Sequence, residues 1–321
     1  MKMKKPESGK IEVNDINIHY EIHGKGEPLL LVQGLGYSSW MWFKQIPDLS
    51  REYKVIIFDN RGVGDSDKPD IEYTIEMMAD DAAWLLRALG IKSAHVLGVS
   101  MGGFIAQEMA INYPDMVKSL ALVSTSFSGR DVMRGGSSSL FSAFAGFWGF
   151  IPAMPDFSGK GNTPIANSFG LTQEKKIRYG LSLAFSPEYF NSHIDEIDRI
   201  VEWRLAHPQP LYAWKRQLMA GMKFDASDRA SQIMAPTLVV TGSEDRVVPS
   251  ENSKRLAEKI PNSRFVEIQG TGHLAFIEQA EEFNKMVLGF LKEITKDKEA
   301  VITMKEIRRW WRTIVSLFYS Y

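Results

Sequence analysis

Eight short apolar runs, most of them separated by stretches with helical periodicity, constrain the fold of this chain more than any other feature. Several are apolar on both faces, which is typical of parallel strands that helices cover on either side. The alternation of strand and helix predicts an α/β fold with a doubly wound, mostly parallel sheet of eight strands, and the turn-forming pair Asn14-Asp15 predicts an antiparallel hairpin at its edge. We expect strands near residues 11–13, 16–22, 29–32, 54–58, 94–99, 119–124, 237–242 and 264–270, and helices near 75–89, 102–112, 251–260 and 278–296.

Between residues 127 and 230 the rhythm of strands stops, and helical patterns such as EIDRIVEWRLA at 196–206 replace it. We therefore expect a helical cap inserted at the carboxyl edge of the sheet. Its run LFSAFAGFWGFI at 140–151 is shorter than the ~20 helical residues that cross a bilayer. It predicts a buried cap helix, or else the wall of an apolar pocket or a mobile lid over an apolar substrate, with Phe144, Phe147 and Trp148 as pocket residues. The predicted units are a core of residues 1–126 and 231–298, a cap of 127–230 and a C-terminal amphipathic helix of 299–321.

Charge and cysteine content exclude several classes of protein. The chain has 38 basic and 39 acidic side chains and a formal net charge of -1, so it lacks the basic footprint of a protein that binds nucleic acid. Without cysteine it cannot form disulfides, iron–sulfur clusters or thiolate zinc sites. No motif indicates a metal or a cofactor, and we predict neither. The basic start MKMKKPESGK leads into no apolar stretch of signal-peptide length, which favours a cytoplasmic location.

A GxSxG motif stands directly after the predicted strand at 94–99 and before a predicted helix. It reads Gly98-Val99-Ser100-Met101-Gly102. The motif alone is a weak signal, but a sharp strand-to-helix turn needs small residues at both glycine positions and lifts the serine hydroxyl clear of the sheet. Ser100 is therefore a candidate nucleophile. A serine hydroxyl attacks well only with a base in reach and an acid that orients the base.

The chain offers one well-placed base and one well-placed acid. His273 follows a late strand in a glycine-lined loop, at the carboxyl end where such sheets present their sites. Asp245 follows the strand at 237–242 and is the candidate acid, with adjacent Glu244 as the fallback and a helix-capping aspartate as the plainer interpretation. The other histidines, at positions 19, 23, 95, 193 and 207, are expected to pack in strands or to belong to the insertion.

The order serine, acid, histidine resembles the α/β hydrolase superfamily, close to its enol-lactonase, esterase and non-haem perhydrolase group, over roughly residues 11–296. The stretch from Asp59 to Ser66 is similar to the family's D-x-R-G-x-G-x-S loop. The resemblance implies a triad of Ser100, His273 and Asp245. It also implies an oxyanion hole formed by the N–H groups of Leu35 and Met101. We expect Gly34 to line the substrate pocket. One departure stands out: Gln33-Gly34 occupies the place of the family's usual His-Gly.

The resemblance favours a serine hydrolase that cleaves a carboxylic ester or lactone, with an apolar acyl part as the expected substrate. Two alternatives stay open. The same triad can let hydrogen peroxide intercept the acyl enzyme, as in a perhydrolase, or the fold can serve as a small-molecule receptor with a slow or vestigial triad. A dinucleotide site is a weaker alternative: Gly34-x-Gly36-x-x-Ser39 follows a strand, but the third glycine of the fingerprint is missing.

The C-terminal tail predicts a further amphipathic helix. Packing on the body of the protein or on a second copy, as a homodimer, is the first interpretation of its apolar face. Because basic residues lie mostly elsewhere on the helix, peripheral contact with a membrane surface is the second. The apolar face carries Met304, Ile307, Trp311, Ile314, Phe318 and Tyr321.

Overall fold

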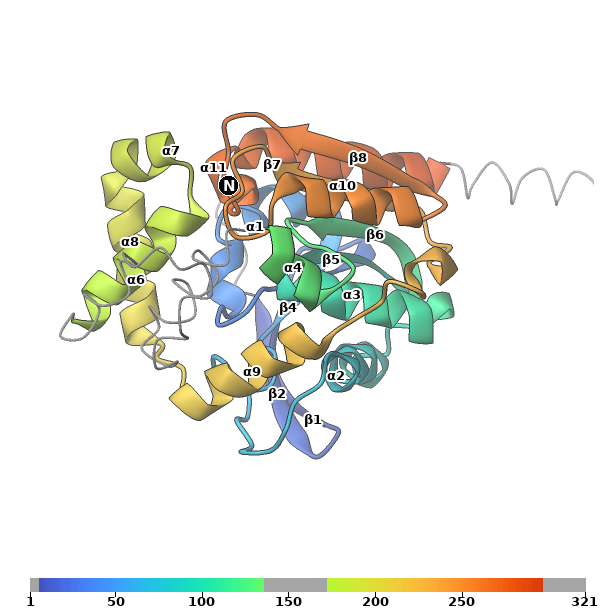
Figure 1. Cartoon of the computed structure of the whole chain (residues 1–321). Helices are drawn as coiled ribbons and strands as arrows, with labels where there is room; N and C mark the ends of the chain where they lie inside the picture. The colour runs from blue at the N-terminus through green and yellow to red at the C-terminus, as the bar shows by residue number, and fades with distance from the viewer. Residues whose placement is uncertain (1–5, 136–171, 297–321) are drawn as a thin grey trace, which may run out of the picture.

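The computed structural model describes residues 6–135 and 172–296, and its centre is one sheet of eight strands (Figure 1). The strand order is β1-β2-β4-β3-β5-β6-β7-β8. The first two strands form the antiparallel hairpin, and β2 also pairs antiparallel with β4, whereas all the other neighbours are parallel. The predicted fold class is thereby confirmed. The strands are β1 (Glu7–Val13), β2 (Ile16–His23), β3 (Glu27–Val32), β4 (Tyr53–Phe58), β5 (Ala94–Val99), β6 (Val117–Val123), β7 (Thr237–Gly242) and β8 (Ser263–Ile268).

The hairpin turn has the residues that its geometry requires. Asn14 and Asp15 both have positive φ, 48° and 61°, which is the conformation of the tight two-residue turns that match strand twist. The first strand starts at Glu7, four residues before the prediction. These early residues are mostly exposed, so no apolar pattern marks them as part of a strand.

Alternate strand residues enter two separate apolar layers, which explains why the strands are apolar on both faces. Leu30 of β3 packs on the side of α2, α3 and α10, whereas Leu29 and Leu31 pack on the side of α1 and of residues 280–296, which are helical. The predicted core helices are confirmed to within two residues at each end. The helices of the core are α1 (Ile46–Leu49), α2 (Ile75–Ala88), α3 (Met101–Asn112), α10 (Ser250–Lys259) and α11 (Ala275–Glu278), with short 3-10 turns η1 (Ser39–Trp42) and η2 (Pro114–Met116).

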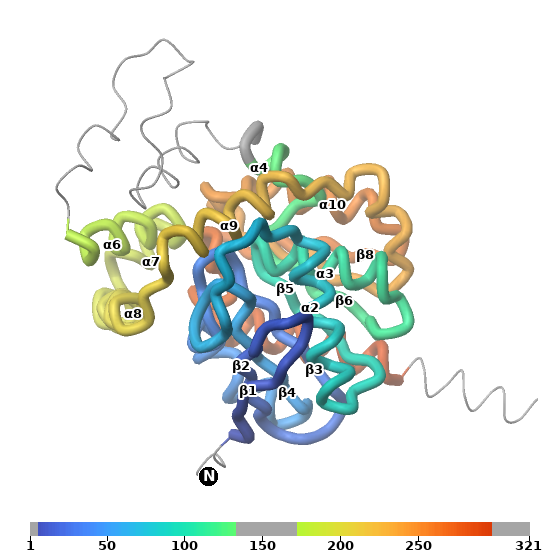
Figure 2. The backbone as a smooth tube through the Cα atoms, turned by 90° about the horizontal axis from the view of Figure 1, so that it is seen from below, coloured from blue at the N-terminus to red at the C-terminus, as the bar shows by residue number. Residues whose placement is uncertain are grey.

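Helices replace strands between β6 and β7, as the sequence indicates. Ser186 caps one of them: its Oγ accepts from Tyr189 N, and Pro187 occupies the first helical position, where a missing N–H costs nothing. Figures 1 and 2 show α6, α7 and α8 to one side of the sheet, with α9 leading back toward it. The elements are α4 (Gly129–Gly135), α6 (Gln173–Ala184), α7 (Pro187–Ser192), α8 (Ile194–Ala206), α9 (Leu211–Lys223) and the turn η4 (Ala230–Gln232).

Some predictions fall on residues that the structure does not describe. These are the pocket residues Phe144, Phe147 and Trp148, the apolar run at 140–151 and the amphipathic tail at 299–321. Within the two described ranges, no helix combines the length and the apolar character that crossing a membrane requires.

The strand order places a topological switch point at β3. From β3 the chain moves to β4 on one side, and it later returns to β5 on the other side. The loops that leave the carboxyl ends of β3 and β5 therefore diverge and open a crevice between them, which is where ligands bind in sheets of this type. Leu35 and Ser100 stand in those two loops.

Candidate active site

Ser100 lies on a strained turn between β5 and α3. Its φ of 55° and ψ of -120° fall outside the common regions for a residue with a side chain. The two glycines of the motif permit the turn. A Cβ on Gly98 would come 2.3 Å from the carbonyl oxygen of Gly102, and a Cβ on Gly102 would come 2.1 Å from that of Val32. The motif therefore forms the sharp strand-to-helix turn that the sequence predicts, and any other residue at either glycine would push backbone apart.

Hydrogen bonds hold the strained turn in place. The N–H of Ser100 donates to Val123 O of the neighbouring strand at 2.9 Å. Its carbonyl oxygen accepts from Gly103 N at 2.9 Å and from the hydroxyl of Thr125, also at 2.9 Å. The backbone of Ser100 is thus fixed by three partners, and its side chain is free to line the pocket described below.

His273 and Asp245 meet although they follow different strands. Nδ1 of His273 lies 2.8 Å from Oδ2 of Asp245. The other carboxylate oxygen accepts from the N–H groups of Val247 and Val248 at 2.9 Å and 2.8 Å. Because an ionised carboxylate can only accept, the proton of a neutral His273 lies on Nδ1 and its Nε2 is left as an acceptor.

Burial distinguishes Asp245 from the fallback acid. The side chain of Asp245 has no exposed surface, whereas Glu244 is exposed. Only Asp245 bonds to the imidazole among the described residues. The structure therefore gives Glu244 no part in orienting the histidine.

One pocket collects the predicted residues that the structure describes, apart from the buried acid. Ser100, His273, Leu35, Met101 and Gly34 all line it. Its described wall is mostly apolar and includes residues of α9 from the inserted segment. The polar side chains in that wall are those of Tyr37, Ser100, Gln217 and His273.

Leu35 and Met101, the predicted oxyanion donors, both line the pocket beside Ser100. Met101 is the first residue of α3, and the first N–H groups of a helix have no acceptor within it and favour negative charge. Leu35 follows Gly34, where a Cβ would lie 3.2 Å from Cβ of Ser100, so that glycine lets the loop approach the serine closely. Both N–H groups thus belong to backbone that adjoins Ser100.

Gln33 bonds to backbone through its side-chain amide. It is fully buried, and its Nε2 donates to Phe58 O at 2.6 Å. This contact ties the start of the loop to β4, but it leaves the rest of the loop to other partners. Two of these partners were not predicted. Gly36 N donates to Oε1 of Gln217 at 3.1 Å, and Nη1 of Arg204 donates to Gly36 O at 2.9 Å.

A third unpredicted residue, Glu278, holds the loop that carries His273. Its carboxylate accepts from Gly272 N at 2.8 Å and from the N–H and hydroxyl of Ser186 at 3.1 Å and 2.6 Å. Burial raises the pKa of Glu278, although these hydrogen bonds act against the rise. Glu278 thereby joins the histidine loop to the first turn of α7.

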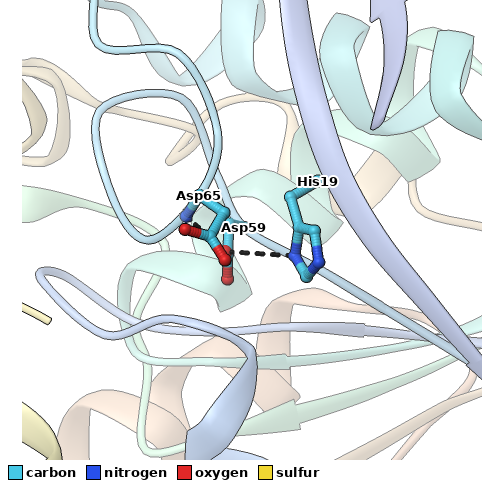
Figure 3. A group of neighbouring side chains, drawn as sticks. All are labelled: His19, Asp59 and Asp65. Atoms are coloured by element: carbon cyan, nitrogen blue, oxygen red, sulfur yellow. Dashed lines mark hydrogen bonds and ion pairs between the residues drawn. The ribbon is translucent and has the colours of Figure 1, made fainter. Parts of the chain in front are cut away.

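Asp59, at the start of the loop from Asp59 to Ser66, lies close to His19 and Asp65 (Figure 3). Asp59 accepts from Ser39 N at 2.7 Å and from Asp65 N at 2.8 Å, and His19 Nδ1 lies 3.4 Å from the same carboxylate. Burial would raise the pKa of Asp59, but the pairing with His19 and the hydrogen bonds from the two N–H groups lower it. His19, Asp59 and Asp65 could also offer atoms to a metal ion, but the two oxygens of Asp59 already have backbone partners. We interpret the group as an ion pair that shapes the loop.

The sheet, the strained serine and the histidine–aspartate pair define the class of this protein as an α/β hydrolase. A family model described as alpha/beta hydrolase fold matches residues 27–151 and 185–280, and the chain belongs to this family. The resemblance found in the sequence is confirmed.

Three relatives illustrate the range of the family around this chain. The chain is 30% identical over 280 residues to "Putative carbamate hydrolase RutD" of Azorhizobium caulinodans. This match covers 87% of this chain and 97% of the relative. It is 26% identical to a thermophilic esterase from Thermogutta terrifontis, with a TM-score of 0.71 and coverage of 90% and 99%. It is also 26% identical to an N-acyl homoserine lactone degrading enzyme, with a TM-score of 0.71 and coverage of 88% and 100%.

Proposed function

We propose that this α/β hydrolase cleaves a carboxylic ester or lactone through an acyl enzyme on Ser100. The observation that carries the proposal is the strained serine in one pocket with a histidine whose far ring nitrogen is bonded to a buried carboxylate. The esterase and the lactone-degrading enzyme among the similar structures support this choice of bond.

In the proposed mechanism, Oγ of Ser100 attacks the carbonyl carbon while Nε2 of His273 takes its proton. Asp245 stabilises the imidazolium that forms. The N–H groups of Leu35 and Met101 bind the oxygen on which negative charge develops, and losing one such donor typically costs about 3 kcal/mol of transition-state stabilisation. The protonated histidine then gives its proton to the leaving alcohol. Water repeats the same steps on the acyl enzyme and releases the acid.

The wall of the pocket supports an apolar acyl part. Apart from the two proposed catalytic side chains, Tyr37 and Gln217 are the polar side chains among the described lining residues. An uncompensated charge on the substrate would lose its hydration there, which is costly. Neutral substrates with hydrocarbon chains are therefore favoured over substrates that carry a free carboxylate.

An activity panel tests the proposed function. We expect the purified chain to hydrolyse p-nitrophenyl esters of graded chain length, or lactones, and to be labelled on Ser100 by a fluorophosphonate. Faster acyl transfer to hydrogen peroxide than to water would instead indicate a perhydrolase. Turnover of a carbamate but of no ester would instead indicate a carbamate hydrolase, the activity for which the relative from Azorhizobium is named. Ligand binding that survives Ser100→Ala, without turnover of any ester, would indicate a receptor.

The pocket has room for a side chain at Gly221 of α9, which allows a prediction on chain length. A Cβ there would lie 3.8 Å from Cγ of Met101 and 3.9 Å from Cε2 of Phe104, which are ordinary contact distances. Gly221→Leu should therefore fill the pocket. We expect kcat/KM for octanoate esters to fall by about tenfold or more, since each methylene that loses its apolar site costs ~1–3 kcal/mol. Acetate esters should change by less than about threefold.

Gly289 supplies the matched control. It lies in the helical segment 280–296, and no atom lies within 4 Å of a Cβ built there. Gly289→Leu makes the same change in helix propensity, up to about 1 kcal/mol, without touching the pocket. If Gly221→Leu lowers kcat/KM by one common factor for all chain lengths, Gly221 does not set the length of the substrate.

A further inference from the structure

The loop that follows β3 is a tight turn whose peptide groups are held one after another. Gly34 O accepts from Tyr37 N at 3.3 Å, and Gly36 occupies the third position of the turn with a φ of 72°. This geometry is that of a type II turn, which needs a positive φ at that position. Leu35, which carries the proposed oxyanion donor, is the residue between these fixed points.

Two side chains of the inserted helices hold Gly36 from both sides. Oε1 of Gln217, on α9, accepts from its N–H at 3.1 Å, and Nη1 of Arg204, on α8, donates to its carbonyl oxygen at 2.9 Å. The guanidinium of Arg204 also stacks 4.6 Å from the ring centroid of Tyr37. The peptide groups on either side of Gly36 are thus fixed by residues that lie far away in the sequence.

Gln217 is itself held in one orientation. It is fully buried, its Nε2 donates to Arg61 O at 2.8 Å, and its Oε1 also accepts from Nε2 of Gln209 at 3.1 Å. Gln209 in turn donates to Gly62 O at 2.8 Å. The oxygen that receives Gly36 N–H is therefore presented by a network that reaches the loop after β4, and the amide cannot rotate without breaking several bonds.

We propose that Gln217 and Arg204 are positioning residues for the oxyanion hole, because they fix the peptide groups that aim the N–H of Leu35 at the substrate. The inference rests on the proposed function for its catalytic consequence. By this inference, helices α8 and α9 do more than cover the pocket: they also hold the loop of the oxyanion hole in position. The side chain of Gln33 donates to Phe58 O, and its backbone carbonyl oxygen accepts from Nδ2 of Asn60 at 3.3 Å, so neither bond reaches Gly36.

Kinetics with three variants test the proposal. We expect Gln217→Leu and Arg204→Met each to lower kcat for a p-nitrophenyl ester by about 10- to 100-fold, which is less than the loss of a donor, since a displacement near 1 Å can cost about 100-fold. KM should change by less than about threefold. The rate of inactivation by paraoxon, whose phosphoryl oxygen occupies the same hole, should fall by the same factor as kcat. Arg204→Lys, which keeps a cationic donor, should recover part of the loss.

Tyr212→Phe is the control for a general weakening of the contact between α9 and the core. Tyr212 also lies on α9, and its hydroxyl donates to Lys68 O at 2.7 Å, away from Gly36. This variant should keep kcat and the paraoxon rate within about twofold. The proposal is wrong if Gln217→Leu and Arg204→Met stay folded with kcat within threefold of the parent chain, or if they change KM alone.

Amide hydrogen exchange keeps the proposal testable whatever the activity proves to be. Gln217→Leu should speed exchange at Gly36, whereas Gln217→Glu, which keeps an oxygen for this N–H but loses the donor to Arg61 O, should keep more protection at Gly36 than Gln217→Leu does. Unchanged protection in Gln217→Leu overturns the anchoring. If Gln217→Leu does not fold, a folded Arg204→Met with kcat within threefold of the parent chain overturns the proposal. A parent chain that reacts with no ester and no paraoxon refutes the proposed function alone, because exchange still reports the anchor.

Discussion

Ser100→Ala is expected to lower kcat for ester hydrolysis by at least about four orders of magnitude, because loss of the nucleophile leaves only the pocket and the oxyanion donors to act on the substrate. KM for the same ester should change little, since the removed hydroxyl is small and the apolar wall is intact. Steady-state kinetics on the best ester of the panel give the measurement, and the fluorophosphonate label should disappear. Retention of more than about 1% of the parent kcat would place the nucleophile elsewhere.

The same position offers a control for folding. Ser100 has a positive φ, which costs roughly 1–3 kcal/mol for a residue with a Cβ, and alanine retains that Cβ. Ser100→Gly relieves the strain but loses ~0.5–1 kcal/mol through the greater freedom of the unfolded chain. We therefore expect Ser100→Gly to be more stable than Ser100→Ala by about 1 kcal/mol in chemical denaturation, with both inactive. If Ser100→Gly is instead less stable than Ser100→Ala by ~0.5–1 kcal/mol, the loss expected from the unfolded chain alone, the turn stores no strain.

Asp245→Asn is expected to lower kcat by about four orders of magnitude while the protein stays folded. An asparagine amide can donate to Nδ1 of His273, which favours the tautomer with the proton on Nε2, where it cannot accept from Ser100. The remaining amide oxygen can still accept from Val247 N and Val248 N, so the loop should keep its shape. Thermal unfolding and kinetics, measured on the same preparation, separate the two effects.

Glu244→Gln is the matched control for this prediction. It makes the same change of carboxylate to amide at the neighbouring position, but on an exposed side chain that does not bond to the histidine. Its kcat should stay within about twofold of the parent value. A loss of comparable size in both variants would show that charge near the loop, and not orientation of the imidazole, sustains the activity.

The fold could be predicted because most of its strands are short apolar runs that stand out in the sequence. Runs such as 29–32 and 237–242 are apolar on both faces, and the structure buries each face against a separate layer of helices. The first strand was predicted too short because Glu7 to Lys10 pair through backbone alone at an exposed edge. Backbone pairing leaves little trace in a pattern of side chains.

The residues proposed for catalysis were predictable for a different reason: each stands in a loop that follows a strand, and parallel strands bring their carboxyl ends to one edge of the sheet. Gln217, Arg204 and Glu278 had no comparable signal. They lie on helices, where periodicity indicates which side is buried and not which distant backbone group a side chain will bind. Gln217 reaches a glycine 181 positions away, and Glu278 bonds to Ser186, which is 92 positions away.

The bond between Glu278 and the start of α7 has a consequence for engineering. Exchanging residues 172–230 for the corresponding helices of another family member is an obvious route to new selectivity, since these helices line the pocket. Such a chimera would remove Ser186 together with Arg204 and Gln217, and so would detach the histidine loop and the turn at Gly36 from their supports at once. A successful graft has to carry these three side chains with it. The helices that would be exchanged also align the two loops of the core that they contact.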